Sequence, residues 1–242
     1  MHPSKADIFA RLQQEVLSLQ GLRTPVLEVA DPIGLGRINN AFPNGVFPRA
    51  ALHEFICADA EGAAASAGFI SGLLPSFLKG GNAVLWVGSR RTLYPPALRA
   101  FGVAPEQVLF LDGLREKDIP WALAEALKCS ALGAVVGELR QLSFTDSRRF
   151  QLAIESSSVP LFVLRRTQKA GSTTAVCRWQ ITPLASDPEE GLPGLGAPRW
   201  RVRLLKVRSG QPGSWDVEWS SQRFRVLPRL TATLPTLQKK TG

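Results

Sequence analysis

The amino-acid sequence predicts an α/β fold in which helices cover both faces of a mainly parallel, twisted sheet. Short apolar segments with the length of buried strands recur along the middle of the chain, and segments with helical periodicity separate them. Apolar strands that alternate with helices are typical of parallel sheets, because each parallel connection needs a crossover. After Leu164 the pattern changes to alternating basic and apolar residues, which predicts an added antiparallel hairpin.

The predicted elements follow one another in a regular order. The strands are expected at 52–56, 83–87, 108–111, 134–136 and 161–164, and the helices at 63–78, 96–101, 118–128 and from 145 or 146 to 156. A further strand is predicted at 177–181. The segments 201–208 and 215–219, joined by the turn Gly210-Gln211-Pro212-Gly213, predict the hairpin at the edge of the sheet.

The N-terminal segment predicts a helical arm. Over residues 6–19 an apolar stripe repeats at three-to-four spacing, and Pro25 and Pro32 then interrupt the pattern. We therefore divide the chain into an arm and linker (1–30), a core (31–228) and a polar tail (229–242). The stripe either packs on its own domain or binds a partner through Ile8, Leu12, Val16 and Leu19.

Composition excludes several classes of protein. With 242 residues, 45% of them hydrophobic, the chain can form a large packed core. It has no apolar run of membrane-spanning length and no signal-peptide pattern. Cys57, Cys129 and Cys177 are widely spaced, which argues against a zinc site and against a disulfide framework. We expect no metal, no membrane and a cytoplasmic location.

The positive charge is concentrated in one part of the chain. The formal net charge is +9, and all of the excess lies after Leu164, where 14 Lys and Arg residues face 5 Asp and Glu residues. Such asymmetry indicates a polyanionic partner, with nucleic acid the first candidate. The alternative is a basic surface that serves solubility alone.

The segment 57–64 occupies the place of a nucleotide-binding loop, between a strand and a helix. Compared with the pattern G-x-x-x-x-G-K-[ST], only Gly62 is in register. Cys57 replaces the first glycine, Ala63 the phosphate-binding lysine and Ala64 the magnesium-binding hydroxyl. Asp59 and Glu61 add negative charge where a polyphosphate would lie. The loop is therefore a degenerate one.

Several segments, in the same order and at similar spacing, resemble RecA. These are 39–49, 86–96, 101–103 and 130–137, and the resemblance extends from Ile38 to Trp219. Within this region 47–49, 93–98 and 144–155 resemble the ImuA family, the RecA-like proteins of bacterial translesion-synthesis mutagenesis cassettes. The resemblance implies a RecA-like domain. It also implies an accessory role in SOS-induced, error-prone DNA synthesis, with an ImuB-like Y-family protein and a DnaE-type polymerase as partners.

The resemblance to RecA also places the missing catalytic groups. The water-orienting glutamate of RecA falls at Arg90 and the magnesium-holding aspartate at Gly137. Glu138 could replace that aspartate by a slip of one residue, but nothing replaces the lysine missing at Ala63. We expect no catalytic residue, no cofactor and no ATP hydrolysis, because no group is left to stabilise the charge of phosphoryl transfer. Two alternatives stay open: a cell-division inhibitor similar to SulA that binds FtsZ, and an ATPase with an unorthodox loop.

The loops after the fourth and fifth strands correspond to those that face DNA in RecA. Here they are 138–143, with the helix start that follows, and 165–176. RecA also joins its subunits through an N-terminal arm, which makes self-association or contact with RecA a further expectation. Trp179 and Trp200 lie next to cations and could stack on bases, although packing on the sheet is the favoured interpretation. The DNA-binding candidates are Arg148, Arg149, Arg165, Arg166, Lys169, Arg178, Arg199, Arg201, Arg203 and Lys206.

Overall fold

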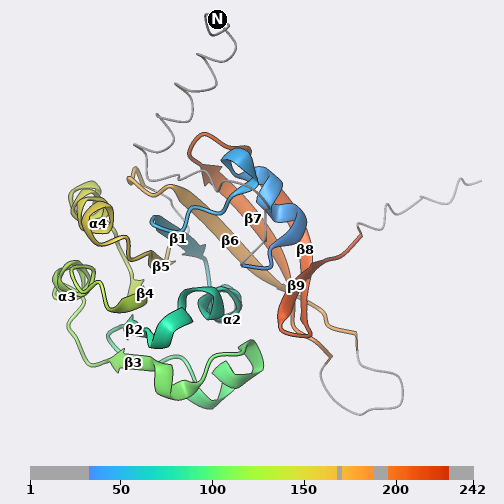
Figure 1. Cartoon of the computed structure of the whole chain (residues 1–242), viewed down its shortest axis with the longest axis horizontal. Coiled ribbons are helices and arrows are strands. Elements are labelled where there is room, and N and C mark those ends of the chain that lie inside the picture. The colour runs from blue at the N-terminus through green and yellow to red at the C-terminus, as the bar shows by residue number, and fades with distance from the viewer. Residues whose placement is uncertain (1–32, 168–170, 188–195, 229–242) are drawn as a thin grey trace, which may run out of the picture.

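The computed structural model describes residues 33–167, 171–187 and 196–228, and these build one nine-stranded sheet (Figure 1). The strand order is β3-β2-β4-β5-β1-β6-β7-β8-β9. Strands β1 to β6 pair in parallel, and β6 to β9 pair antiparallel. This confirms the predicted mainly parallel α/β fold with an antiparallel C-terminal part, and it is consistent with a RecA-like domain. The predicted arm and the tail from residue 229 lie outside the described residues.

The strands are β1 Leu52–Cys57, β2 Ala83–Val87, β3 Val108–Leu111, β4 Leu132–Leu139, β5 Leu161–Arg166, β6 Cys177–Leu184, β7 Arg199–Val207, β8 Gly213–Ser220 and β9 Arg223–Val226. The α-helices are α2 Ala60–Leu73, α3 Ile119–Ala126 and α4 Phe144–Ser157. Short 3-10 helices lie at Gly36–Ala41 (η1), Pro43–Gly45 (η2), Leu74–Phe77 (η3), Lys79–Gly81 (η4), Pro95–Phe101 (η5) and Pro105–Gln107 (η6).

The sheet has a separate hydrophobic core on each face. Helix α2 and the N-terminal 3-10 helices pack on one face, and α3 and α4 pack on the other, over β2, β4, β5 and β1 (Figure 1). Strands covered on both faces are apolar throughout, as Phe162, Val163 and Leu164 of β5 are. The antiparallel strands differ, because only the face toward α2 is apolar.

Small residues let α2 approach the antiparallel strands closely. A Cβ on Gly72 would lie 2.6 Å from a ring carbon of Phe224 and 2.9 Å from one of Trp219, so a larger residue would push the helix away. Helix α2 ends at Leu73, earlier than predicted, because Pro75 cannot continue the α-helical hydrogen-bond ladder. The chain goes on as the 3-10 helix η3.

Other boundaries differ from the prediction for local reasons. Residues 95–101 form a 3-10 helix that ends at left-handed Gly102. Helix α4 begins at Phe144, ahead of the predicted start, because the hydroxyl of Ser143 accepts a hydrogen bond from the Asp146 N–H at 2.9 Å. Asp118 stands before α3, but its carboxylate pairs with Arg115 and does not cap the helix.

Candidate nucleic-acid interface and the degenerate nucleotide loop

A side chain of the protein itself occupies the start of α2, where a nucleotide phosphate would bind. Asp59 precedes the helix in extended conformation, and its Oδ1 accepts a hydrogen bond from the Gly62 N–H at 2.7 Å. A carboxylate there satisfies the unpaired amides and the positive end of the helix dipole. A phosphate would have to displace Asp59 and then remain next to its charge.

Cys57, at the first position of the loop 57–64, is also inaccessible to a phosphate. Cys57 is buried at the end of β1, and its thiol donates to the Ser66 hydroxyl at 3.4 Å. Burial raises the pKa of the Cys57 thiol, so this side chain stays neutral. The methyl groups of Ala63 and Ala64 offer neither a charge nor a metal ligand.

A packing contact explains why β4 carries no carboxylate at Gly137. A Cβ on Gly137 would lie 2.6 Å from the end of the Leu123 side chain of α3, so an aspartate would displace this buried leucine. The neighbouring Glu138 accepts hydrogen bonds from Trp86 Nε1 at 3.0 Å and from the Thr92 hydroxyl, and it pairs with Arg166 at 3.5 Å. Glu138 thus serves to hold β2, the segment after it and β5 together.

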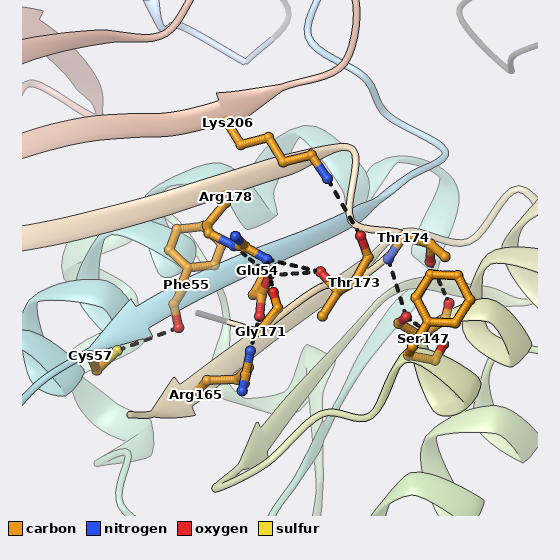
Figure 2. Close-up of polar contacts among 11 residues, drawn as sticks. Glu54, Phe55, Cys57, Ser147, Arg165, Gly171, Thr173, Thr174, Arg178 and Lys206 are labelled. Atoms are coloured by element: carbon orange, nitrogen blue, oxygen red, sulfur yellow. Dashed lines mark hydrogen bonds and ion pairs between the residues drawn. The ribbon is translucent and has the colours of Figure 1, made fainter. Parts of the chain in front are cut away.

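The most buried charges of the described chain meet at Glu54 of β1 (Figure 2). Its side chain is 0% exposed and pairs with Arg165 of β5, whose side chain is 6% exposed. The Glu54 Oε2 also accepts from Arg178 Nε at 2.8 Å and from the Thr173 hydroxyl at 3.0 Å. Arg165 is therefore a structural residue, and its inclusion among the DNA contacts is wrong: its guanidinium is enclosed and neutralised.

The part of the segment after β5 that the structure describes, residues 171–176, is fastened at several points (Figure 2). Arg178 donates to the Gly171 carbonyl at 2.8 Å, and Thr174 makes two hydrogen bonds to Ser147 of α4. Lys206 donates to the Thr173 carbonyl at 3.4 Å, and Arg208 to that of Thr174 at 3.2 Å. The hydroxyls of Thr173 and Thr174 are thus used in hydrogen bonds within the protein.

The side of β6 to β9 that faces away from α2 is strongly basic. Trp200, Val202 and Leu204 of β7 point into the core, so the residues between them point to the opposite face. Across the described residues no helix packs on that side of these strands. We call this surface the cationic sheet face; it carries Arg178, Arg199, Arg201, Arg203, Lys206, Arg223 and Arg225.

Two acids on β8 partly balance this charge. Arg201 makes a two-pronged contact with Asp216 at 2.7 and 2.9 Å, and Arg199 pairs with Glu218 at 2.7 Å. Arg203, Arg223 and Arg225 form no ion pair with a described residue. Partial burial, together with repulsion from Arg178 and Arg208, lowers the pKa of Lys206. Two cations thus lie close enough to Lys206 to repel it, and attraction to Glu54 offsets part of this repulsion.

The remaining candidates lie elsewhere. Arg148 and Arg149 are exposed on α4, and Arg166 lies beside Glu138 at the end of β5. Lys169 and the stripe of Ile8, Leu12, Val16 and Leu19 fall outside the described residues. Trp179 and Trp200 are buried in the core. This confirms the interpretation that they pack on the sheet, and it leaves neither ring free to stack on a base.

Sequence reasoning missed Arg223 and Arg225, because β9 was not predicted. The alternation in Arg223-Phe224-Arg225-Val226 is the signal that could have found them.

Arg90 is exposed in the segment after β2. The described residues contain no cluster of His, Cys, Asp and Glu side chains suited to a metal ion, and none of their helices has the length and apolarity to cross a membrane.

Fold and site together define an α/β domain, consistent with the RecA-like class, in which Asp59 caps α2 and alanines occupy positions 63 and 64. The chain is 33% identical over 208 residues to protein ImuA from two strains of Caulobacter vibrioides, and the match covers 81% of this chain and 84% of each relative. The chain belongs to the ImuA family. No protein-family model matches it.

Proposed function

We propose that this ImuA-family protein is a non-catalytic accessory factor of SOS-induced, error-prone translesion synthesis. It binds DNA without regard to sequence and links it to an ImuB-like Y-family protein and a DnaE-type polymerase. Family membership supports this role over that of a SulA-like inhibitor of FtsZ. The Asp59 cap and the alanines at 63 and 64 support it over the role of an ATPase with an unorthodox loop.

The cationic sheet face is the observation that carries DNA binding. Arginine and lysine side chains on an uncovered sheet surface can contact phosphates, which fix the position of DNA but give no sequence information. Exposed cations on a protein otherwise balanced in charge also release counterions from DNA, which makes binding dependent on salt.

Removing three cations of this face should reduce the salt dependence of DNA binding. In the variant Arg203→Ala/Lys206→Ala/Arg225→Ala, the slope of log affinity against log salt should fall by about two to three, because each phosphate contact contributes about 0.7 to 0.9. Fluorescence anisotropy at several salt concentrations measures the slope. None of the three forms an ion pair with a described residue; the variant removes the hydrogen bonds of Lys206 to the Thr173 carbonyl and of Arg203 to Gln180, so circular dichroism should verify that the fold is kept.

A matched control removes the same charge from other surfaces. Arg37, Arg90 and Lys117 are exposed, lie outside β6 to β9, and also form no ion pair with a described residue. Their combined replacement with Ala should leave the slope close to that of the unmodified protein. If the slope of log affinity against log salt fell equally in both variants, only the net charge would matter for DNA binding. The cationic sheet face would then not be the DNA site.

A further inference from the structure

We propose that the cationic sheet face binds double-stranded DNA in preference to single-stranded DNA, by contacting two lines of phosphates. The inference rests on the proposed DNA-binding function and specifies its ligand. Two features carry it: the absence of aromatic rings from this face in the described residues, and the arrangement of its cations in two rows.

All the aromatic rings of β6 to β9 point toward α2. Trp179, Trp200, Trp215, Trp219 and Phe224 belong to the core on that side or pack against it. Phe69 of α2 contacts the rings of Trp179, Trp200 and Phe224, and the ring centroids of Trp219 and Phe224 are 4.8 Å apart. Proteins that hold single strands use exposed aromatic rings as platforms for unstacked bases. This face offers single-stranded bases no such platform, and a duplex needs none because its bases remain stacked.

The cations that form no ion pair flank the acidic strand β8. Arg203 and Lys206 lie on β7, and Arg223 and Arg225 lie on β9. Strands two positions apart are separated by about 9.6 Å. The register also displaces the two rows along the strands, because Arg203 is opposite Ser214 of β8 and Arg225 is opposite Glu218, four residues or about 14 Å further along. A duplex presents two lines of phosphates at the sides of a groove, whereas a single strand presents one.

The acids of β8 strengthen the preference. Asp216 and Glu218 hold Arg201 and Arg199 along the middle of the face. A single line of phosphates down the middle would meet these carboxylates, whereas two lines, one above β7 and one above β9, avoid them. The charge density of a duplex, about one charge for each 1.7 Å of its axis, also favours it at a face that binds by charge.

The test compares a duplex of about 20 base pairs with each of its separate strands and with oligo-dT of the same length, by fluorescence anisotropy at several salt concentrations. We expect the duplex to bind about tenfold more tightly, with the steeper salt dependence of duplex binding. Arg203→Ala/Lys206→Ala and Arg223→Ala/Arg225→Ala should each weaken duplex binding and lower its slope by up to about two. The control Arg37→Ala/Lys117→Ala should not.

The outcomes separate the two proposals. Single strands that bind as tightly as the duplex, or a β9 variant that binds duplex like the unmodified protein, would overturn the two-row inference and leave DNA binding in place. No binding to any of the oligonucleotides at low salt would overturn DNA binding itself, and the cations would then serve an acidic protein partner.

Discussion

Replacing Glu54 with Gln should lower the free energy of unfolding by about 3–5 kcal/mol, the usual cost of removing one partner from a buried ion pair. The change keeps the shape of the side chain but removes the carboxylate that neutralises Arg165, which is enclosed at 6% exposure. The glutamine amide keeps one acceptor oxygen and replaces the other with an NH2 group, so either Arg165 or both Arg178 and Thr173 lose their acceptor. Segment 171–176 would be loosened together with the core.

Denaturant unfolding measures this effect, and Glu106→Gln is the matched control. Glu106 also pairs with an arginine, Arg99, at 3.7 Å, but both side chains are 73% exposed. That variant should lose at most about 1 kcal/mol, because water screens exposed ion pairs. Substituting Glu54→Leu, Arg165→Met and Arg178→Met together should recover part of the loss, since both cations that pair with Glu54 are then replaced by apolar groups. A loss below about 1 kcal/mol for Glu54→Gln would show that the pair is accessible to water.

Acidification should destabilise the protein through His53. This imidazole is buried between Phe47 and Phe162, donates from Nε2 to the Pro48 carbonyl at 2.8 Å and accepts at Nδ1 from Trp179. Burial lowers the pKa of His53 from 6.5 to about 4. The unfolded chain therefore takes up a proton at a higher pH than the folded one.

The direction of the pH dependence of stability follows from the lowered pKa of His53. The contribution of His53 to stability is complete above about pH 6.5 and is lost as the pH falls toward 4. At about 1.4 kcal/mol for each pH unit between the two pKa values, the loss is about 3 kcal/mol. Denaturant unfolding from pH 7.5 to 4, compared between the unmodified protein and His53→Phe, isolates it, because the carboxylates titrate in both. Parallel pH profiles would contradict the buried neutral histidine.

The periodicity of the sequence was sufficient to predict most of the sheet. The apolar segments of β2, β4 and β5 are continuous because both faces of these strands are covered, and the basic-apolar alternation of 201–208 marks a strand with one uncovered face. The prediction of a degenerate loop rests on residue types in a fixed pattern, above all the alanines at 63 and 64. What the pattern did not predict is that Asp59 would take the place of a phosphate.

Long-range pairing could not be predicted. Glu54 and Arg165 are 111 residues apart, and only the register of β1 on β5 brings them together. From the sequence Arg165 and Arg178 looked like any other cations of the basic C-terminal part. The two-row arrangement depends likewise on the β8–β9 turn, where Ser221 and Gln222 adopt left-handed conformations that residue type alone did not indicate.

Titration of the protein with Mg-ATP by calorimetry, at physiological salt, tests the non-catalytic assignment most directly. We expect no heat of binding at physiological nucleotide concentration, because Asp59 caps α2 and Ala63 and Ala64 supply neither the phosphate-binding lysine nor the magnesium ligand. Micromolar affinity for Mg-ATP would contradict the non-catalytic assignment. It would favour the alternative of an ATPase with an unorthodox loop.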